Sequence, residues 1–422
     1  MRMFLRSRAV AGVSAAVAVA LGITAAPAKS APPAASPAGP NQAAAVPAPP
    51  ADCLLPAADV YNEHEGPTDY GRWLQPTGTL RGIVLFVRFP GVTPPAGELA
   101  QRTSLLSGAP AWFSQSSYGG VTLQLTFDTV WRQLPNSQTT YSGYNVDFNV
   151  QRAYVQDAVN VADAAINFSQ YDLVYVVAPS NASSLPNSPS FIANVGWGAW
   201  ADGVELRHGA TFGQDLSHWG YKVLNHETGH VFGLPDLYAY AADQHQAAGG
   251  WDLMGLISGP APDLLAWHKW KLGWLADNQI VCQDGSGSTP ATLTPLGASG
   301  GTKALVVRTG ERDAVVVENR QVSQLDVASS CFQPGVLVYR VTTTVGGGGI
   351  PPGSNTPVPG GPRPIRVADR LPNSTIAGCD ARAAELANAT LTAVNHAVTV
   401  DGVTVRVTAH DGSNRSVQVT VP

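Results

Sequence analysis

One short stretch of the chain carries side chains of the kinds that bind and activate a metal ion. Residues 226–236 read HETGHVFGLPD, which places His226 and His230 four residues apart. On an α-helix that spacing sets both imidazoles on one face, one turn apart. Two imidazoles in this arrangement can bind the same ion.

The residues around the two histidines complete a catalytic site. Gly233 supplies the left-handed residue that ends a helix, and Asp236 follows where the returning chain can offer a third ligand. Three protein ligands leave the fourth position of a zinc ion open to water, as in catalytic sites. Glu227 lies within reach of that water without being a ligand, which is the position of a general base. The sequence therefore predicts one zinc ion bound by His226, His230 and Asp236.

A methionine follows the motif in a glycine-rich stretch, GGWDLMG at residues 249–255. A methionine in a tight turn after such a motif can form an apolar floor beneath the metal's histidines. Met254 is the sole methionine after residue 3. It is either that floor or an ordinary core side chain, and its placement favours the floor.

Two helices are predicted in and near the motif. The active helix is predicted from His218 to about Phe232 with Ser217 as its N-cap, and His218 is expected on its surface. A second amphipathic helix is predicted to start at about Ala261 and to end at Gly273, with His268 on its outer face.

The region before the motif alternates between strand and helix patterns. Apolar or alternating runs at 81–88, 121–127 and 172–178 predict strands, and residues 98–117 in part and 150–165 predict helices. Strands that alternate with helices imply a mixed α/β layer structure.

Two further short strands are possible at 191–195 and 204–207. One of them could be an edge strand that accepts a peptide by strand addition. A plain loop fits these residues equally well.

From about residue 279 the pattern changes to short β segments separated by Gly and Pro, which suggests a small all-β domain. These segments are 304–308, 314–318, 336–341, 398–407 and 416–421. The Gly- and Pro-rich stretch 345–364 is predicted to be a long mobile loop.

The N-terminus has the features of an export signal. A basic start precedes an uncharged apolar run from Ala9 to about Ala26, so residues 1–28 are predicted to be a signal peptide. An uncleaved anchor is the alternative. Residues 29–52 are rich in Ala and Pro and are expected to be a linker or short leader. The catalytic domain is then placed at 53–278 and the β-rich domain at 279–422.

Four cysteines, Cys53, Cys282, Cys331 and Cys379, would meet an oxidising environment after export. Two disulfides are expected, with three possible pairings. We favour Cys331 with Cys379 and Cys53 with Cys282. Use of Cys53 as an inhibitory thiolate on the zinc would leave an odd cysteine.

Composition excludes some classes of protein. Of the 422 residues, 44% are hydrophobic and 13% charged, and the net charge is −5. This is enough apolar material for a buried core, and nothing suggests nucleic acid or an anionic membrane as partner. Calcium binding is possible, but no calcium-loop motif supports it. We expect a monomer that acts on protein or peptide substrates.

The motif also extends beyond the ligands. HETGHVFGLPDLY at 226–238, GWDLM at 250–254 and the helix that ends in LGW at 272–274 resemble the immune-inhibitor-A-like secreted metalloproteases, which are metzincin-like bacterial peptidases. The resemblance is close over 218–276 and loose over 60–276.

That resemblance implies a zincin-like catalytic domain with a mixed sheet and an active-site helix. It also implies zinc at His226, His230 and Asp236, Glu227 as the base and Met254 as the Met-turn. Many metzincins carry a third His where this chain has Asp236.

The function expected is a secreted zinc endopeptidase in which Glu227 takes a proton from water and passes it to the leaving amine. Tyr238 or Tyr240 could help to stabilise the oxyanion, although packing is the favoured role for both. The alternatives are a binding module with an inert zinc site and a zinc hydrolase of a non-peptide bond.

Overall fold

The computed structural model describes residues 53–57, 63–240, 245–259, 262–354, 356–381 and 384–422. The predicted signal peptide and linker, residues 1–52, lie outside the described residues. Within the described ranges, no helix is long and apolar enough to cross a membrane.

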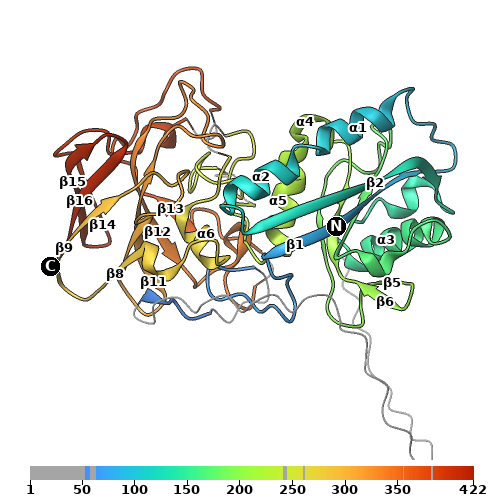
Figure 1. Ribbon diagram of the computed structural model, residues 1–422, viewed down its shortest axis with the longest axis horizontal. Helices are drawn as coiled ribbons and strands as arrows, with labels where there is room; N and C mark the ends of the chain where they lie inside the picture. The colour runs from blue at the N-terminus through green and yellow to red at the C-terminus, as the bar shows by residue number, and fades with distance from the viewer. Residues whose placement is uncertain (1–52, 58–62, 241–244, 260–261, 355, 382–383) are drawn as a thin grey trace, which may run out of the picture. The chain divides into compact units, whose positions relative to one another are not determined.

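The first half of the described chain is organised by a five-stranded sheet with the order β2-β1-β3-β7-β4 (Figure 1). Four strands are parallel and the edge strand β4 is antiparallel to β7. The strands are β1 (Gly78–Arg88), β2 (Val121–Gln133), β3 (Leu173–Val177), β7 (His208–Phe212) and β4 (Ser190–Ile192). The predicted mixed α/β architecture is confirmed.

Helices cover both faces of this sheet. Successive residues of β1 contribute to different cores, since Val84 and Leu85 point to opposite faces. The face of Val84 is covered by α1 (Glu98–Leu106), α2 (Ala109–Ser116) and α5 (Tyr221–Val231), and the face of Leu85 by α3 (Phe148–Ala162). Burial on both faces explains why β1 is a continuous apolar run. A separate hairpin is formed by β5 (Ala199–Ala201) and β6 (Val204–Leu206).

The active helix begins later than predicted. Residues 216–219 form a separate turn, α4 (Leu216–Trp219), and α5 starts at Tyr221. Gly220 between them has φ 56 and ψ −139, a conformation that glycine adopts without strain. Ser217 therefore lies inside α4 and does not cap α5, while His218 is exposed as predicted.

The second helix, α6 (Ala266–Lys271), is shorter than predicted but stops before Gly273, which has φ 72. The prediction that His268 faces outward is wrong, because its side chain is fully buried. Its Nδ1 lies 2.9 Å from an Asp252 carboxylate oxygen and its Nε2 lies 3.1 Å from one of Glu65. These two carboxylates offset the cost of taking the imidazole out of water. Burial alone would lower the pKa of His268, but Asp252 and Glu65 raise it to about 10.

The second half of the described chain forms two further sheets, with the orders β13-β12-β11-β10-β8 and β14-β15-β16-β9. Four of the five predicted β segments lie within single strands, whereas 398–407 spans two strands, β14 and β15, joined by a turn at residues 401–402. The strands are β8 (Ile280–Asp284), β9 (Gly287–Leu293), β10 (Ala304–Arg308), β11 (Asp313–Arg320), β12 (Gly335–Thr342), β13 (Ile365–Val367), β14 (Ala397–Val400), β15 (Val403–Asp411) and β16 (Asn414–Val421).

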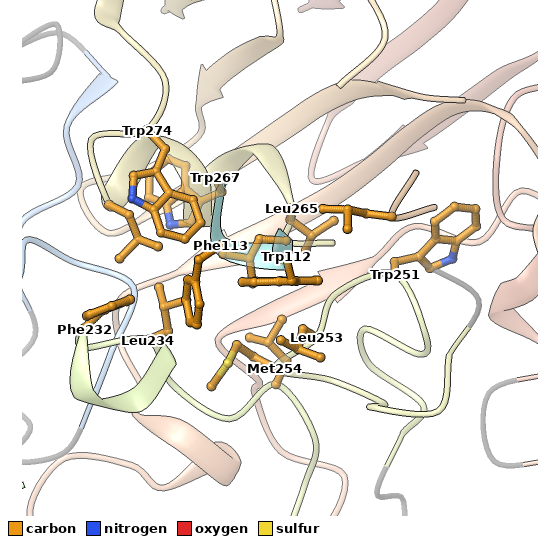
Figure 2. Packing of buried hydrophobic residues seen from close by; sticks show 14 of the residues in the cluster. Trp112, Phe113, Phe232, Leu234, Trp251, Leu253, Met254, Leu265, Trp267 and Trp274 are labelled. Atoms are coloured by element: carbon orange, nitrogen blue, oxygen red, sulfur yellow. The ribbon is translucent and has the colours of Figure 1, made fainter. Parts of the chain in front are cut away.

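These two sheets share one core, and the first of them has a second core on its other face. Val315 and Val317 of β11 pack toward β15 and β16, whereas Val316 belongs to the core that surrounds α2, α5 and α6. That core includes the tryptophans labelled in Figure 2. The two domains predicted at 53–278 and 279–422 therefore share a continuous apolar core.

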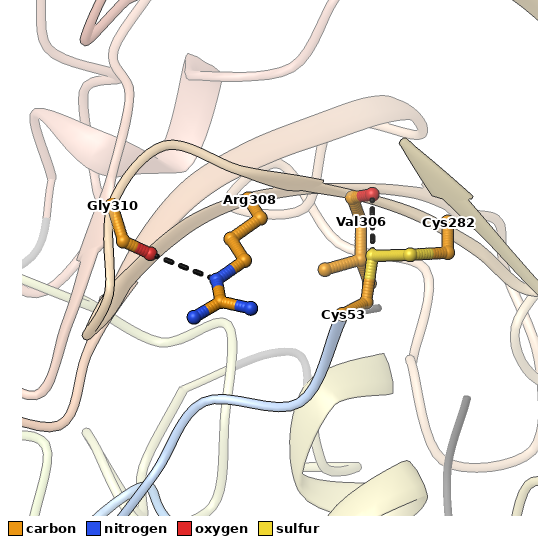
Figure 3. Close-up of a disulfide and its surroundings, with 5 residues drawn as sticks. All are labelled: Cys53, Cys282, Val306, Arg308 and Gly310. Carbon is orange, nitrogen blue, oxygen red and sulfur yellow. Dashed lines mark hydrogen bonds between the residues drawn. A yellow bond between two sulfur atoms is a disulfide. The ribbon is translucent and has the colours of Figure 1, made fainter. Parts of the chain in front are cut away.

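Both favoured disulfides are present, Cys53–Cys282 and Cys331–Cys379. Figure 3 shows the first, in which Cys53 is bonded to Cys282 of β8 beside Val306 of β10. The N-terminal part of the described chain is thus tied covalently to the second half, and Cys53 is not available as a zinc thiolate.

Candidate metal centre

The three predicted metal ligands come together. His226 and His230 lie on α5 with ring centroids 4.8 Å apart. Oδ1 of Asp236 lies 3.1 Å from Nε2 of His226 and 3.3 Å from Nε2 of His230. All three residues are buried, and one ligand atom of each lies within 4.8 Å of the others.

Gly233 makes this return of the chain possible. It follows the end of α5 with φ +88, so the predicted left-handed residue is confirmed. A Cβ at this position would lie 2.7 Å from Cγ2 of Thr68. Any other residue would therefore be strained by its backbone and crowded by Thr68.

The orientation of each histidine is set by the main chain. Nδ1 of His226 lies 3.0 Å from the carbonyl oxygen of Leu253, and Nδ1 of His230 lies 2.8 Å from that of Leu234. A carbonyl oxygen can only accept, so Nδ1 carries the proton in both rings. Each Nε2 is thereby directed toward Asp236.

This donor set fits a zinc ion. Oδ1 of Asp236 is buried and accepts no hydrogen bond of normal geometry, although two Nε2 atoms lie close to it. Two imidazole nitrogens and one carboxylate oxygen that converge on one point are a common protein contribution to a catalytic zinc.

The electrostatics agree with this reading. Burial would lower the pKa of His230, but Asp236 raises it to about 10. Burial would raise the pKa of Asp236, but His230 and His226 lower it. The carboxylate thus requires positive charge at this point, which either protons or a cation can supply.

Tyrosines border the ligands. The hydroxyl of Tyr240 donates a hydrogen bond to Oδ2 of Asp236, which leaves Oδ1 for an ion. The ring of Tyr240 is half exposed. Tyr238 stacks on His226 with ring centroids 6.1 Å apart. Both tyrosines therefore pack around the site, as the sequence analysis favoured.

Met254 packs against α5 as part of the apolar core. Its side chain is fully buried, and its Sδ would be 2.7 Å from a Cβ placed on Gly229. Gly229 is the residue before His230, so the methionine fills the space that this glycine leaves open. Figure 2 shows Met254 beside Leu253, whose carbonyl orients His226.

Glu227 is buried beside the ligands, with 8% of its surface exposed. Burial raises the pKa of its carboxyl to about 7, against the opposing effect of His226 and His230. A carboxyl with a pKa near neutrality can both accept and return a proton. Glu227 lines the same cavity as the three ligands, and its role as a base stays a prediction.

The ligands and Glu227 line a cavity of about 570 Å³. Residues 187–190 contribute to its wall, and Ser190 is the first residue of edge strand β4. Of the strand and the loop considered for residues 191–195, the structure has a strand that ends at Ile192, and among the described residues it is an edge strand of the five-stranded sheet.

Three further titratable residues line the cavity and were missed by the sequence analysis: Glu63, Asp215 and His245. Burial raises the pKa of Asp215, to which the Ser188 hydroxyl donates a hydrogen bond. The His245 and Tyr238 rings lie 5.6 Å apart. These residues come from three separate segments, so no spacing in the sequence could have grouped them.

Distant structural likenesses to known proteins exist. No protein-family model and no curated protein matches the chain. Metalloproteinase-II from Bacteroides fragilis is similar over 50% of this chain, with 15% sequence identity and a TM-score of 0.28. The match spans 55% of the length of that chain. The functional assignment therefore depends on the geometry of the site.

Proposed function

We propose that the protein is a secreted zinc-dependent endopeptidase, related to the immune-inhibitor-A-like metalloproteases. The observation that carries the proposal is the convergence of two Nε2 atoms and Oδ1 of Asp236 beside a buried Glu227. His226, His230 and Asp236 would hold the ion.

Each residue has a distinct role in the reaction. A bound zinc supplies Lewis acidity, which makes water more acidic and a carbonyl more electrophilic. Glu227 accepts a proton from the attacking water and later delivers it to the nitrogen of the leaving amine. The hydrogen bonds from His226 and His230 to backbone carbonyls keep both rings in place during these transfers.

The sheet edge beside the cavity favours a peptide as the substrate. An extended peptide can add to an edge strand through main-chain hydrogen bonds, and Ser190 of β4 lines the same cavity as Glu227 and the ligands. We therefore propose that the substrate runs along β4. This feature favours peptide hydrolysis over the hydrolysis of a non-peptide bond.

Two features support export of the chain. Residues 1–28 have the pattern of a signal peptide, and the two disulfides suit an oxidising compartment. We propose that the mature protein acts outside the cell as a monomer, on protein or peptide substrates, with Met254 as the floor of its metal site.

The test is the zinc content and proteolytic activity of the purified protein. We expect one zinc per chain and cleavage of casein, and we expect Glu227→Gln to keep the zinc and lose activity by about 10²- to 10⁴-fold. Glu311→Gln, at an exposed glutamate, is the matched control and should behave as wild type.

A zinc-loaded wild type that cleaves neither casein nor gelatin would contradict the proposal. The binding module and the non-peptide hydrolase would then be the remaining candidates. Full activity in Glu227→Gln would show that another group is the base.

A further inference from the structure

A loop from the C-terminal β region contacts the segment that carries the third ligand. We call residues 346–349 the glycine loop; it lies between β12 and β13 and is buried. The Gly348 N–H donates to the carbonyl oxygen of Asp236 at 3.1 Å, and the Tyr240 N–H donates to the carbonyl oxygen of Gly348 at 3.4 Å. The sequence analysis placed these glycines in a mobile loop, whereas the structure buries them against the site.

The same loop also contacts the N-terminal part of the described chain. The Gly347 N–H donates to the carbonyl oxygen of Glu63 at 2.9 Å, and Glu63 lines the metal cavity. A Cβ on Gly347 would lie 3.1 Å from the backbone nitrogen of Asp236. Three segments distant in sequence therefore meet at the third ligand.

Gly348 lies directly against the ring of Tyr240. Its φ is +67, and a Cβ there would lie 2.4 Å from both Cδ2 and Cε2 of Tyr240. Such a distance is far below van der Waals contact, so any side chain at residue 348 must displace the ring.

The ring position matters because Tyr240 reaches the metal ligand. Its hydroxyl donates to Oδ2 of Asp236, the oxygen that does not face the histidines. A hydrogen bond to the outer oxygen of a ligating carboxylate fixes the direction of the inner one. Gly348 restrains the Tyr240 ring on one side, and Tyr238 packs against the ring with centroids 5.7 Å apart.

We propose that Gly348 and Tyr240 are positioning residues that hold Asp236 in its metal-binding orientation, and that the C-terminal β region thereby completes the metal centre. This inference rests on the proposed zinc site. It assigns a role in metal binding to a part of the chain that supplies no ligand.

The test measures zinc affinity by competition with a chelator in the full chain. Gly348→Ala displaces the ring, and Tyr240→Phe removes the hydroxyl but keeps the ring. We expect each variant to bind zinc about 10- to 100-fold more weakly and to change the visible absorption spectrum of the cobalt-substituted protein.

Gly353→Ala is the matched control. Gly353 lies in the same connection with φ +68, almost the value of Gly348, but a Cβ there meets nothing within 4 Å. An alanine therefore takes a positive φ in both variants, but only at residue 348 does its Cβ meet Tyr240. We expect Gly353→Ala to keep the wild-type zinc affinity.

A double variant separates the proposed route from general destabilisation. If Gly348 acts through the Tyr240 hydroxyl, Gly348→Ala should weaken zinc binding much less in a Tyr240→Phe background than in the wild type. Wild-type zinc affinity in both Gly348→Ala and Tyr240→Phe would overturn this inference but not the proposed function. Equal losses of zinc affinity in Gly348→Ala and Gly353→Ala would do the same. A wild-type protein that binds no zinc would overturn the proposed function as well.

Discussion

At the scale of single residues, the site depends on glycines as much as on ligands. Gly233 lets the chain turn back toward the histidines, and Gly229 lets Met254 approach α5. Both glycines lie within the motif, so the same eleven residues provide the ligands and the space around them. A side chain at either glycine would disturb the site without touching a ligand.

Gly229→Ala tests the contact between α5 and Met254. Alanine favours the helix by about 1 kcal/mol relative to glycine, but its Cβ would lie 2.7 Å from Sδ of Met254. Overpacking of this kind costs about 1–3 kcal/mol. We expect a net loss of stability, measured by urea unfolding.

The control for this prediction is the double variant that carries both Gly229→Ala and Met254→Ala. Met254→Ala alone removes buried atoms and should destabilise by about 2–5 kcal/mol. If the crowding is real, Gly229→Ala should be tolerated better in the Met254→Ala background than in the wild type. Additive losses would show that the loss in Gly229→Ala does not come from the contact with Met254.

At the scale of elements, α6 connects the methionine turn to the N-terminal segment. Asp252 accepts hydrogen bonds from the backbone N–H groups of Met254 and Leu265, and it also pairs with His268. His268 in turn pairs with Glu65. This buried triad fixes the turn whose Leu253 carbonyl orients the ligand His226.

The triad should make stability depend on pH. The pKa of His268 is raised from 6.5 to about 10. The pairing of the charged imidazole therefore stabilises the folded protein fully below pH 6.5, and this stabilisation is lost as pH rises toward 10. The pKa of Asp252 is lowered, so its contribution is present above its unfolded value and is lost on strong acidification. We expect wild-type stability to fall by a few kcal/mol between about pH 6.5 and pH 10.

His268→Gln is the comparison for that measurement. Glutamine does not titrate, so this variant should be less stable than wild type near pH 6 and should lose less between pH 6.5 and pH 10. Parallel urea-unfolding profiles for the two proteins across that range would contradict a charged His268.

At the scale of the whole molecule, the β region contacts the segments that carry Met254 and α6. Arg320 of β11 donates to the carbonyl oxygen of Trp251, and Glu318 accepts from the backbone N–H of Ala266 at the start of α6. Arg320 is itself paired with Asp326 and Glu318. A buried charge network thus joins β11 to the turn that carries Met254 and to α6.

A chain that ends at residue 278 should therefore fail to form the site. Truncation exposes the apolar face around Trp267 and Trp270 and removes the partners of Trp251 and Ala266. We expect the truncated protein to lack a cooperative thermal transition and to bind zinc weakly. A folded fragment with wild-type zinc affinity would contradict the role given to the β region.

The sequence predicted the ligand set because those residues are close together along one helix and one turn. It failed where contacts join distant segments. His268 looked like a surface residue because its two carboxylate partners are far away in the sequence, and Gly348 looked like part of a mobile loop. The helix break was missed although Gly220 itself was a visible signal.

The disulfide between Cys53 and Cys282 has a consequence for proteolytic maturation. A cut at any bond before Cys53 separates the residues before it, because the sequence has no cysteine before Cys53. A single cut between residues 53 and 282 leaves both pieces covalently joined, with the segment that carries Glu63 and Glu65 still attached to β8. The bond therefore retains this segment beside the metal centre even when the chain is cut once between Cys53 and Cys282.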